Sequence, residues 1–454
     1  MPLSARLKFS KENELILNSN QTVVRDRIRS KMEGGEYALE EVACFCGETE
    51  ALSVAERDRY GLSVNTMLCM NCGLMRTTPR LSKESTEQFY KEDYRALYSG
   101  HITREAKFQK DVEQGRNLVE QMPSLIGQVE TVYDIGCGTG GLLFGIAETG
   151  KTVAGCDIDE NYLAVGRDKG LDLICGGVQD LIKAKGGQAD LVLLSHVAEH
   201  FLSLRAELED AIQAIRPGGF LLVEVPGIRN IPDDYGGNLL AYLQNAHTYH
   251  FTGQTLSYVL RSMGLQVIVS NEQTMAAAMR PEGWAPGAPA VKPSDGEALS
   301  VLAFLAELER EYLFRDKDTQ EGETGQDMET WPLGTEATLC ILAWPKYDDL
   351  ESLVRVLTVA EPLYGNPNAC LCLRFDHETD IPYEEATKQL EKAFEKVKRD
   401  GDLNVLMLDE PIPKADWPRL GKAMTCVLQT DPEIDDIHTE FINALGIEII
   451  SGRE

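Results

Sequence analysis

The sequence predicts an α/β protein with a parallel sheet at its centre. From Thr131 onward, short apolar strands alternate with segments that carry apolar residues at helical spacing, a pattern typical of parallel sheets covered by helices. A second alternation of this kind begins at Ala337. Two close pairs of cysteines precede the first alternation, and their spacing predicts a small metal-bound lobe ahead of the sheet.

Composition limits the classes of function. The 454 residues suffice for two or three domains. With 44 Lys and Arg against 73 Asp and Glu, the net charge is −29, which disfavours general binding to nucleic acid or to anionic membranes. No run of 18 apolar residues and no apolar secretory region is present, so we expect no membrane span. Eleven cysteines are too few for a disulfide scaffold, which favours a cytoplasmic protein.

The central region is expected to contain five strands and then a late sixth. These strands are predicted at Thr131–Ile135, Thr152–Asp157, Leu171–Cys175, Asp190–Ser195, Gly219–Pro226 and Leu265–Val269. Helices are expected between them, among them Leu202–Ile215 and Thr252–Met263, and Asp159 is expected to cap a third.

By composition the chain divides into five parts. Residues 1–40 are a mostly polar arm or short helix, 41–80 a zinc-binding ribbon, 81–280 the central α/β domain, 281–335 a linker with one helix and an acidic loop, and 336–454 a second small α/β domain. Strands of the last part are predicted at Ala337–Ala343, Ala369–Arg374, Leu403–Leu408, Met424–Leu428 and Ile447–Ile450.

A glycine-rich turn follows the first central strand. The string VYDIGCGTGG (132–141) provides the sharp bend that lets a ligand approach the backbone. It also fits G-x-G-x-x-G, so a nicotinamide or flavin dinucleotide is one interpretation. Asp134 would repel a pyrophosphate but suits a cationic ligand, such as the α-ammonium group of S-adenosylmethionine (SAM). Asp157, 23 residues later, suits the ribose hydroxyls of either ligand.

Four strings in order make residues 131–280 resemble the class I SAM-dependent methyltransferases. They are DIGCGTGG, GCDID, ADLVLLSHVAEH and RPGGFLLVEVP. The resemblance implies a Rossmann-like sheet that binds the cofactor along its carboxyl edge. The residues implied as cofactor-binding are Asp134, Gly136, Cys137, Gly138, Gly140, Asp157, Ile158, Gly177, Val178, Ser195 and His196. Many members carry an acidic residue near Gly177, and this chain does not.

The cysteine pairs Cys44–Cys46 and Cys69–Cys72 are separated by 22 residues, and a glycine follows each pair. Four thiolates on two tight turns match a tetrahedral structural zinc site. With the segment FYKEDYRALYSG (89–100), these pairs make the chain resemble zinc-ribbon methyltransferases, among them deoxysugar C-methyltransferases of polysaccharide and natural-product clusters. That resemblance implies carbohydrate biosynthesis, with a sugar or glycoconjugate acceptor methylated on oxygen or carbon.

Histidines are the candidates for the catalytic base, because imidazole accepts a proton near neutral pH. His200, His247 and His250 all follow predicted strands and should face one cleft. A Glu-His pair of the sugar C-methyltransferases matches Ala246-His247, so the resemblance implies His247 as the base, with His250 and His200 as rivals. Tyr94 lies in the segment that resembles their substrate-contacting tyrosines.

Two other functions stay open from the sequence. One is a nicotinamide-dependent oxidoreductase on the same glycine loop, and the other is a non-catalytic SAM-binding module of an assembly. The order of elements in residues 336–454 resembles one half of a two-domain glycosyltransferase, without a phosphate loop. We expect this part to hold a sugar acceptor, or to dock a second copy of the chain or a glycan-assembly partner.

Overall fold

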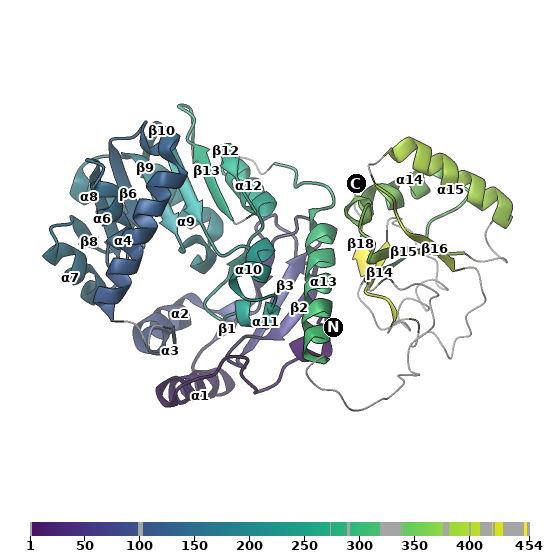
Figure 1. Cartoon of the computed structure of the whole chain (residues 1–454), viewed down its shortest axis with the longest axis horizontal. Helices are drawn as coiled ribbons and strands as arrows, with labels where there is room; N and C mark the ends of the chain where they lie inside the picture. Colours follow the sequence, from purple (N-terminus) through teal and green to yellow (C-terminus); the bar gives the residue numbers. More distant parts are fainter. Residues whose placement is uncertain are drawn as a thin grey trace.

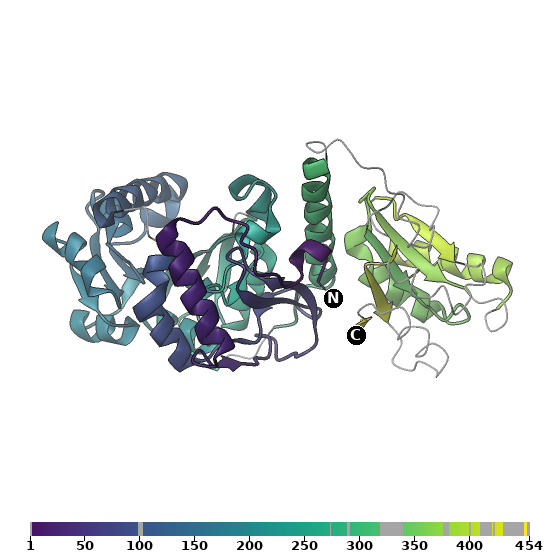
Figure 2. The ribbon, with the colours of Figure 1, turned by 90° about the horizontal axis from the view of Figure 1, so that it is seen from below.

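Two α/β lobes lie on either side of one long helix, α13 (Glu297–Lys317) (Figure 1). The view from below shows the same order (Figure 2). The computed structural model describes residues 2–98, 103–272, 274–287, 291–317, 337, 339–375, 381–398, 401–408, 420, 423–429 and 449–451. Among the helices of these residues, none is both long enough and apolar enough to cross a membrane.

Seven strands form the sheet of the larger lobe, in the order β12-β13-β10-β9-β6-β7-β8. They are β6 (Thr131–Ile135), β7 (Thr152–Asp157), β8 (Leu173–Cys175), β9 (Ala189–Ser195), β10 (Ile215–Glu224), β12 (Gln266–Ser270) and β13 (Met275–Met279). The predicted parallel core, β6 to β10, is confirmed. The sequence does not predict β13, which runs antiparallel to both neighbours, because its three alanines lack the branched side chains typical of strands.

Helices cover both faces of this sheet, since alternate strand residues enter two separate cores. Leu191 and Leu193 pack in one core, and Val192 and Leu194 in the other. The helices are α4 (Arg104–Gln121), α5 (Pro123–Ile126), α6 (Gly141–Ala147), α7 (Glu160–Asp168), α8 (Val178–Lys185), α9 (Leu204–Gln213) and α12 (Gly253–Ser262). The predicted cap of α7 is confirmed, because Asp159 accepts hydrogen bonds from the backbone N–H groups of Asn161 and Tyr162.

Helices α4 and α6 cross unusually closely, and glycine permits this approach. A β-carbon on Gly141 would lie 2.4 Å from the carbonyl oxygen of Phe108, and one on Gly145 would lie 2.5 Å from that of Val112. Larger residues would therefore push the two helices apart. The crossing fixes the start of α6, which is where the glycine loop ends.

The N-terminal part carries the cysteine lobe and a helical wall. Its elements are α1 (Ser19–Glu33), β1 (Leu39–Glu40), β2 (Ala51–Arg57), β3 (Ser63–Cys69), β4 (Met75–Thr77), β5 (Arg80–Leu81), α2 (Lys83–Phe89), the π-helical turn η2 (Tyr90–Tyr94) and α3 (Arg95–Tyr98). Residues 1–40, expected to form an arm or short helix, contain the 15-residue α1, whose Val24 and Ile28 are buried. A four-stranded sheet has the order β11-β4-β3-β2, and β11 (Tyr249–His250) comes from far along the chain.

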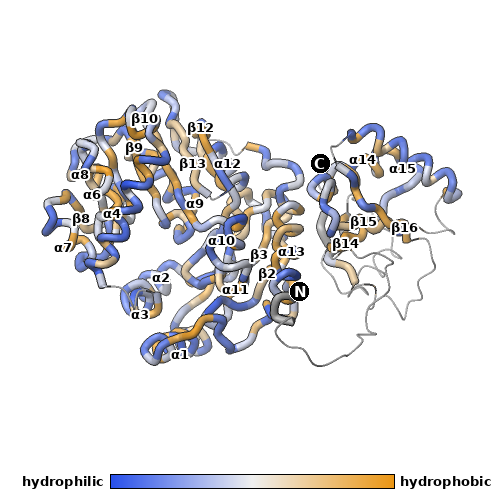
Figure 3. Tube along the Cα trace, viewed as in Figure 1, coloured by the Kyte–Doolittle hydropathy of each residue, from blue (hydrophilic) through white to orange (hydrophobic). Residues whose placement is uncertain are grey.

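The smaller lobe holds a five-stranded parallel sheet in the order β16-β15-β14-β17-β18. Its elements are β14 (Leu339–Ala343), α14 (Leu350–Val359), β15 (Ala369–Arg374), α15 (Tyr383–Val397), β16 (Val405–Leu408), β17 (Cys426–Gln429) and β18 (Ile449–Ser451). This confirms a second α/β region. The predicted acidic loop falls mostly on residues 318–336, outside the described residues, as does part of the last predicted strand. The strands of both large sheets are mostly hydrophobic (Figure 3). Apolar residues of α13 pack in one hydrophobic core together with residues of both lobes.

Candidate active site

A cleft of about 1940 Å³ opens at the carboxyl edge of β6, β7 and β9. One wall is formed by the glycine loop and by the turns that follow β7 and β9. The opposite wall is formed by side chains of α2, η2 and α3. Ligands of open α/β sheets bind at this edge, so the cleft lies where the sequence places the cofactor.

The glycine loop connects β6 to α6 in a conformation that favours glycine. Gly136, Gly138 and Gly140 have φ angles of 73°, 55° and 77°, in the left-handed region. A β-carbon on Gly136 would also lie 2.6 Å from Val197 Cγ2. The backbone N–H groups of Gly136 and Cys137 donate to the carbonyl oxygen of Cys156, at 2.8 and 3.0 Å, which holds the loop against β7.

Two carboxylates flank this loop. Asp157 Oδ2 accepts a hydrogen bond from the N–H of Gly138 at 2.9 Å, and its Oδ1 accepts one from the N–H of Asp159 at 2.8 Å. Asp134 is only 3% exposed. Burial, followed by the charges of Asp111 and Asp157, raises the pKa of Asp134 well above its ordinary value. Burial is the larger cause of this shift; the neighbouring carboxylates of Asp111 and Asp157 add a negative potential at the end of β6, which attracts a cationic group and repels a phosphate.

The other residues predicted to bind the cofactor are mostly at the cleft. Cys137, Ile158, Gly177, Ser195 and His196 line it, and Ile158 presents an apolar side chain that is 72% exposed. Gly140 and Val178 do not line it: Gly140 turns the chain into α6, and Val178 is the first residue of α8 and packs against the sheet.

Ser195 belongs to a small polar cluster at the end of β9. Its hydroxyl donates to Glu224 Oε2 at 2.9 Å, and Gln114 Nε2 donates to the same oxygen at 3.0 Å. Gln114 comes from α4, so this cluster ties the helix to the carboxyl edge of the sheet.

Three of the four predicted catalytic residues line the cleft: Tyr94, His200 and His247. His250 does not, and it is 1% exposed. Burial lowers the pKa of His250 to about 3, so its ring stays neutral. Its ring centroid lies 5.9 Å from that of His247, behind the wall of the cleft.

Glu199 faces two histidines of the cleft. Its Oε1 lies 3.6 Å from His196 Nδ1 and 3.8 Å from His200 Nε2, and the residue is 2% exposed. Burial lowers the pKa of His196, but the hydrogen bond and charge of Glu199 outweigh burial, so the net shift is upward. His200 Nδ1 lies 2.8 Å from the carbonyl oxygen of Ala246 and 3.0 Å from Tyr90 Oη. Because a carbonyl oxygen only accepts hydrogen bonds, Nδ1 carries the ring proton of the neutral imidazole. Nε2, which faces Glu199, is then free to accept a second proton.

The hydrogen bonds of His247 give it a different role. Arg59 Nη2 donates to Gln244 Oε1 at 2.6 Å, so the Gln244 amide turns its NH₂ group toward His247 Nε2, with which it is hydrogen-bonded. Nε2 therefore accepts, and Nδ1 carries the ring proton. In the described part of the chain this buried Nδ1 has no hydrogen-bond partner. Burial, followed by the neighbouring His200 and His250, holds the pKa of His247 well below its ordinary value. His247 is thus a neutral donor.

A ladder of tyrosines forms part of the opposite wall. The ring centroids of Tyr90 and Tyr94 lie 4.6 Å apart, and those of Tyr94 and Tyr98 lie 4.9 Å apart. The turn that carries them is fixed from behind, because the fully buried Asp93 accepts a hydrogen bond from Tyr37 Oη at 2.5 Å and pairs with Lys31 at 3.0 Å. Single π-helical turns are frequent at functional sites.

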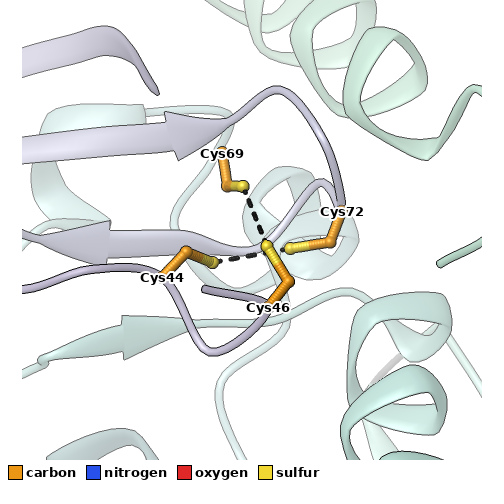
Figure 4. Close-up of side chains that lie close together, drawn as sticks. All are labelled: Cys44, Cys46, Cys69 and Cys72. Carbon is orange, nitrogen blue, oxygen red and sulfur yellow. Dashed lines mark hydrogen bonds between the residues drawn. The ribbon is translucent and has the colours of Figure 1, made fainter. Parts of the chain in front are cut away.

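The four predicted zinc ligands come together (Figure 4). Sγ of Cys44 lies 3.5 Å from that of Cys72, and Sγ of Cys46 lies 3.6 Å from that of Cys69. A tetrahedral zinc site with bonds of about 2.3 Å separates its sulfurs by about 3.8 Å, so the cluster fits this ion. Gly47 and Gly73, which follow the two pairs, have φ angles of 93° and 75°, as tight turns require.

The cysteine lobe contacts the segment that carries His247 and His250 through its sheet. Strand β4 pairs with β11, with Arg76 opposite Tyr249 and Met75 opposite His250. Thr77 extends this pairing: its N–H donates to the carbonyl oxygen of Thr248 at 3.0 Å, and its hydroxyl donates to that of His247 at 2.9 Å. The segment that follows Cys72 therefore fixes the backbone that carries His247.

Several residues of the cleft were not among the sites predicted from the sequence. They are Arg59, Tyr90, Asp111, Gln114 and Gln244. Asp111 and Gln114 lie one turn apart on α4 near the buried Phe108 and Val112, so helical spacing was a signal for them. No residue spacing in the sequence predicts that Arg59 lies at the cleft, because Arg59 belongs to a different lobe.

The family described as Methyltransferase domain matches residues 90–270. Residues 90–270 form a class I SAM-dependent methyltransferase domain. Curated proteins similar to this methyltransferase domain include the mitochondrial ubiquinone biosynthesis O-methyltransferase of Homo sapiens, 26% identical over 175 residues, which cover 33% of this chain and 46% of the relative. The ubiquinone biosynthesis O-methyltransferase of Idiomarina loihiensis is 31% identical over 94 residues, 19% of this chain and 39% of the relative. The chain thus spans less than half the length of these relatives.

Solved structures similar to the chain include an O-methyltransferase family protein from Burkholderia thailandensis. It is 22% identical with a TM-score of 0.34, covering 44% of this chain and 63% of that one. Another is the 1,6-didemethyltoxoflavin-N1-methyltransferase of the same organism, 15% identical with a TM-score of 0.35, covering 46% of this chain and 96% of that one.

Proposed function

We propose that the protein transfers a methyl group from SAM to an oxygen or a carbon of a sugar or glycoconjugate. The observation that carries the proposal is the pair of carboxylates at the glycine loop. Asp134 supplies a buried carboxyl group, which gives up its proton when the cationic ammonium group of the methionine part binds beside it, and Asp157 supplies acceptors for the ribose hydroxyls. A dinucleotide would instead place a pyrophosphate beside Asp134.

The size and lining of the cleft support a large, polar acceptor. Its volume of about 1940 Å³ exceeds the roughly 300–1,000 Å³ of common ligand sites, so a bound SAM leaves room beside it. The remaining space is lined by the tyrosine ladder and by the histidines, which offer aromatic faces and hydrogen-bonding groups. The resemblance to zinc-ribbon sugar methyltransferases selects a sugar within this class.

Methyl transfer is a displacement at an already activated sulfonium carbon, so the protein must orient the acceptor and take up its proton. The hydrogen bonds favour His200 as the base over His247, because His200 Nε2 is free to accept a proton and Glu199 stabilises the resulting charge. His247 has a separate role, in which its Nδ1–H orients the acceptor oxygen and stabilises negative charge that develops there. His196, also beside Glu199, borders the methyl donor.

The metal and the smaller lobe have supporting roles in this proposal. Cys44, Cys46, Cys69 and Cys72 would hold a zinc ion with four thiolates, a closed structural site without an open position for substrate. The smaller lobe holds part of the acceptor or docks a second copy or a glycan-assembly partner.

The test is transfer of labelled methyl groups from SAM by the purified full chain. The acceptor panel comprises free and nucleotide-linked sugars, with ubiquinone precursors added because the relatives are named for ubiquinone biosynthesis. We expect turnover with at least one sugar, and loss of that turnover in His200→Ala without loss of SAM affinity. Transfer only to ubiquinone precursors would refute the sugar assignment, and failure to bind SAM would refute the proposal as a whole.

A further inference from the structure

Arg59 places a positive charge on the wall of the cleft, beside Tyr98, Gln244 and His247. Its Nη1 donates to the carbonyl oxygen of Ala241 at 3.3 Å, and its Nη2 donates to Gln244 Oε1 at 2.6 Å. Both acceptors are neutral. Its Nε is buried and, within the described residues, has no acceptor at all.

No carboxylate forms an ion pair with this charge in the described part of the chain. Two other arginines of the same cleft differ in this respect: Arg80 pairs with Glu40 at 3.1 Å and Arg95 with Asp159 at 3.2 Å. The adjacent Asp58 is engaged elsewhere, because its carboxylate accepts from the backbone N–H groups of Tyr60, Leu62 and Asn245. A largely buried cation without a carboxylate partner is unfavourable unless a ligand supplies the opposite charge.

The side chains around Arg59 fix the position of its guanidinium group but do not neutralise its charge. Its Cζ lies 5.2 Å from the ring centroid of Tyr60 and 5.5 Å from that of Tyr98. Tyr98 is fixed in turn, since its hydroxyl donates to Asn245 Oδ1 at 2.5 Å. Gln244 connects Arg59 to His247, whose ring centroid lies 4.9 Å from that of His200. The charge is therefore within the reach of an acceptor bound at the histidines.

We infer that the methyl acceptor carries an anionic group, a carboxylate or a phosphate, and that Arg59 binds it. This inference rests on the proposed function, because it specifies the acceptor of the same site. The chain as a whole has a net charge of −29 and repels anions. An anionic acceptor therefore needs a local cation, and a guanidinium matches carboxylate and phosphate oxygens geometrically.

The experiment measures binding of simple anions to the full chain by calorimetry in the presence of S-adenosylhomocysteine. Inorganic phosphate and acetate are titrated separately, and the anion that saturates identifies the group. We expect saturable binding, a dissociation constant at least about tenfold higher in Arg59→Met, and a partial return in Arg59→Lys, which keeps the charge but not the planar donors. The matched control is Lys91→Met, which removes the same charge from an exposed residue of the cleft mouth and should change binding less than about twofold.

The outcomes separate this inference from the proposed function. S-adenosylhomocysteine affinity, measured on every variant, shows that the fold and the cofactor site are intact. If the protein binds that cofactor product but neither anion, or if Arg59→Met binds anions as the unaltered protein does, the inference is wrong and the methyltransferase assignment stands. If the cofactor product does not bind, the proposed function fails, and the same titrations without it still decide whether Arg59 is an anion site.

Discussion

Removal of the metal should lower turnover while leaving the cofactor site intact. The cysteine cluster lies outside the cleft, but Thr77, five residues after Cys72, makes two hydrogen bonds to the segment that carries His247. A structural zinc site organises the chain around its ligands, so its loss releases this strand from β11. The glycine loop belongs to a different sheet and keeps its own hydrogen bonds to Cys156.

The two Thr77 hydrogen bonds determine how far turnover should fall when the metal is removed. At about 0.5–1.5 kcal/mol each, they hold the histidine segment by about 1–3 kcal/mol. If the free segment is inactive, their loss lowers turnover by a factor of about 5 to 160. Release of the Arg76 and Met75 pairing adds to this loss.

The assay combines three measurements on one sample treated with a strong chelator. Metal content confirms removal of one zinc per chain, calorimetry gives the SAM affinity, and methyl transfer gives turnover. The control variant Thr77→Val keeps the metal but loses the hydroxyl bond to His247, and its turnover should fall about 2- to 12-fold, for a loss of about 0.5–1.5 kcal/mol. Full turnover after verified loss of the metal would refute this coupling, and parallel loss of SAM affinity would show unfolding of the whole larger lobe instead.

Further predictions concern single residues. Asp157→Ala should weaken SAM binding by about 1.5–3 kcal/mol, or roughly 10- to 160-fold, because charge-assisted hydrogen bonds are lost; calorimetry showing unchanged affinity would exclude Asp157 from the site. His200→Ala should lower kcat by a factor of about 10²–10⁴, as expected for loss of a general base. His247→Ala should lower kcat by a factor of about 10²–10³, as expected for loss of an oriented hydrogen-bond donor. If either variant has the same kcat as the unaltered protein, that histidine does not have the proposed role. Burial raises the pKa of Asp58 to about 6. Between about pH 4 and 6 the folded protein therefore binds more protons at this group than the unfolded chain does. The contribution of Asp58 to the free energy of unfolding should fall by up to about 3 kcal/mol as the pH rises through that window. Unfolding experiments on Asp58→Asn should show a flatter pH dependence there, and an identical slope would contradict the assignment.

The sequence could predict features that depend on neighbours along the chain. The glycine loop, the cap at Asp159 and the two cysteine knuckles are each specified by residues a few positions apart, and the structure contains all three. The parallel strands β6 to β10 could likewise be found from their apolar runs.

Features that depend on distant contacts could not be predicted. Strand β13 is stabilised as a strand by its two neighbours, which override the helical preference of its alanines. The pairing of β4 with β11 joins residues 75–77 to residues 248–250, and no local pattern reports it. The same is true of Arg59, whose partners Ala241 and Gln244 lie more than 180 residues further along the chain. The tautomers of His200 and His247 follow from such contacts, so the order of the candidate bases changes only once the fold is known.

The most direct test of the cofactor assignment is a pair of calorimetric titrations of the purified full chain, one with SAM and one with NADH. The buried carboxyl group of Asp134, beside the charges of Asp111 and Asp157, should admit the cationic cofactor at one site per chain and exclude the dinucleotide, and Asp134→Asn should weaken the binding of SAM. Saturable binding of NADH without binding of SAM would contradict the assignment of this domain's cofactor.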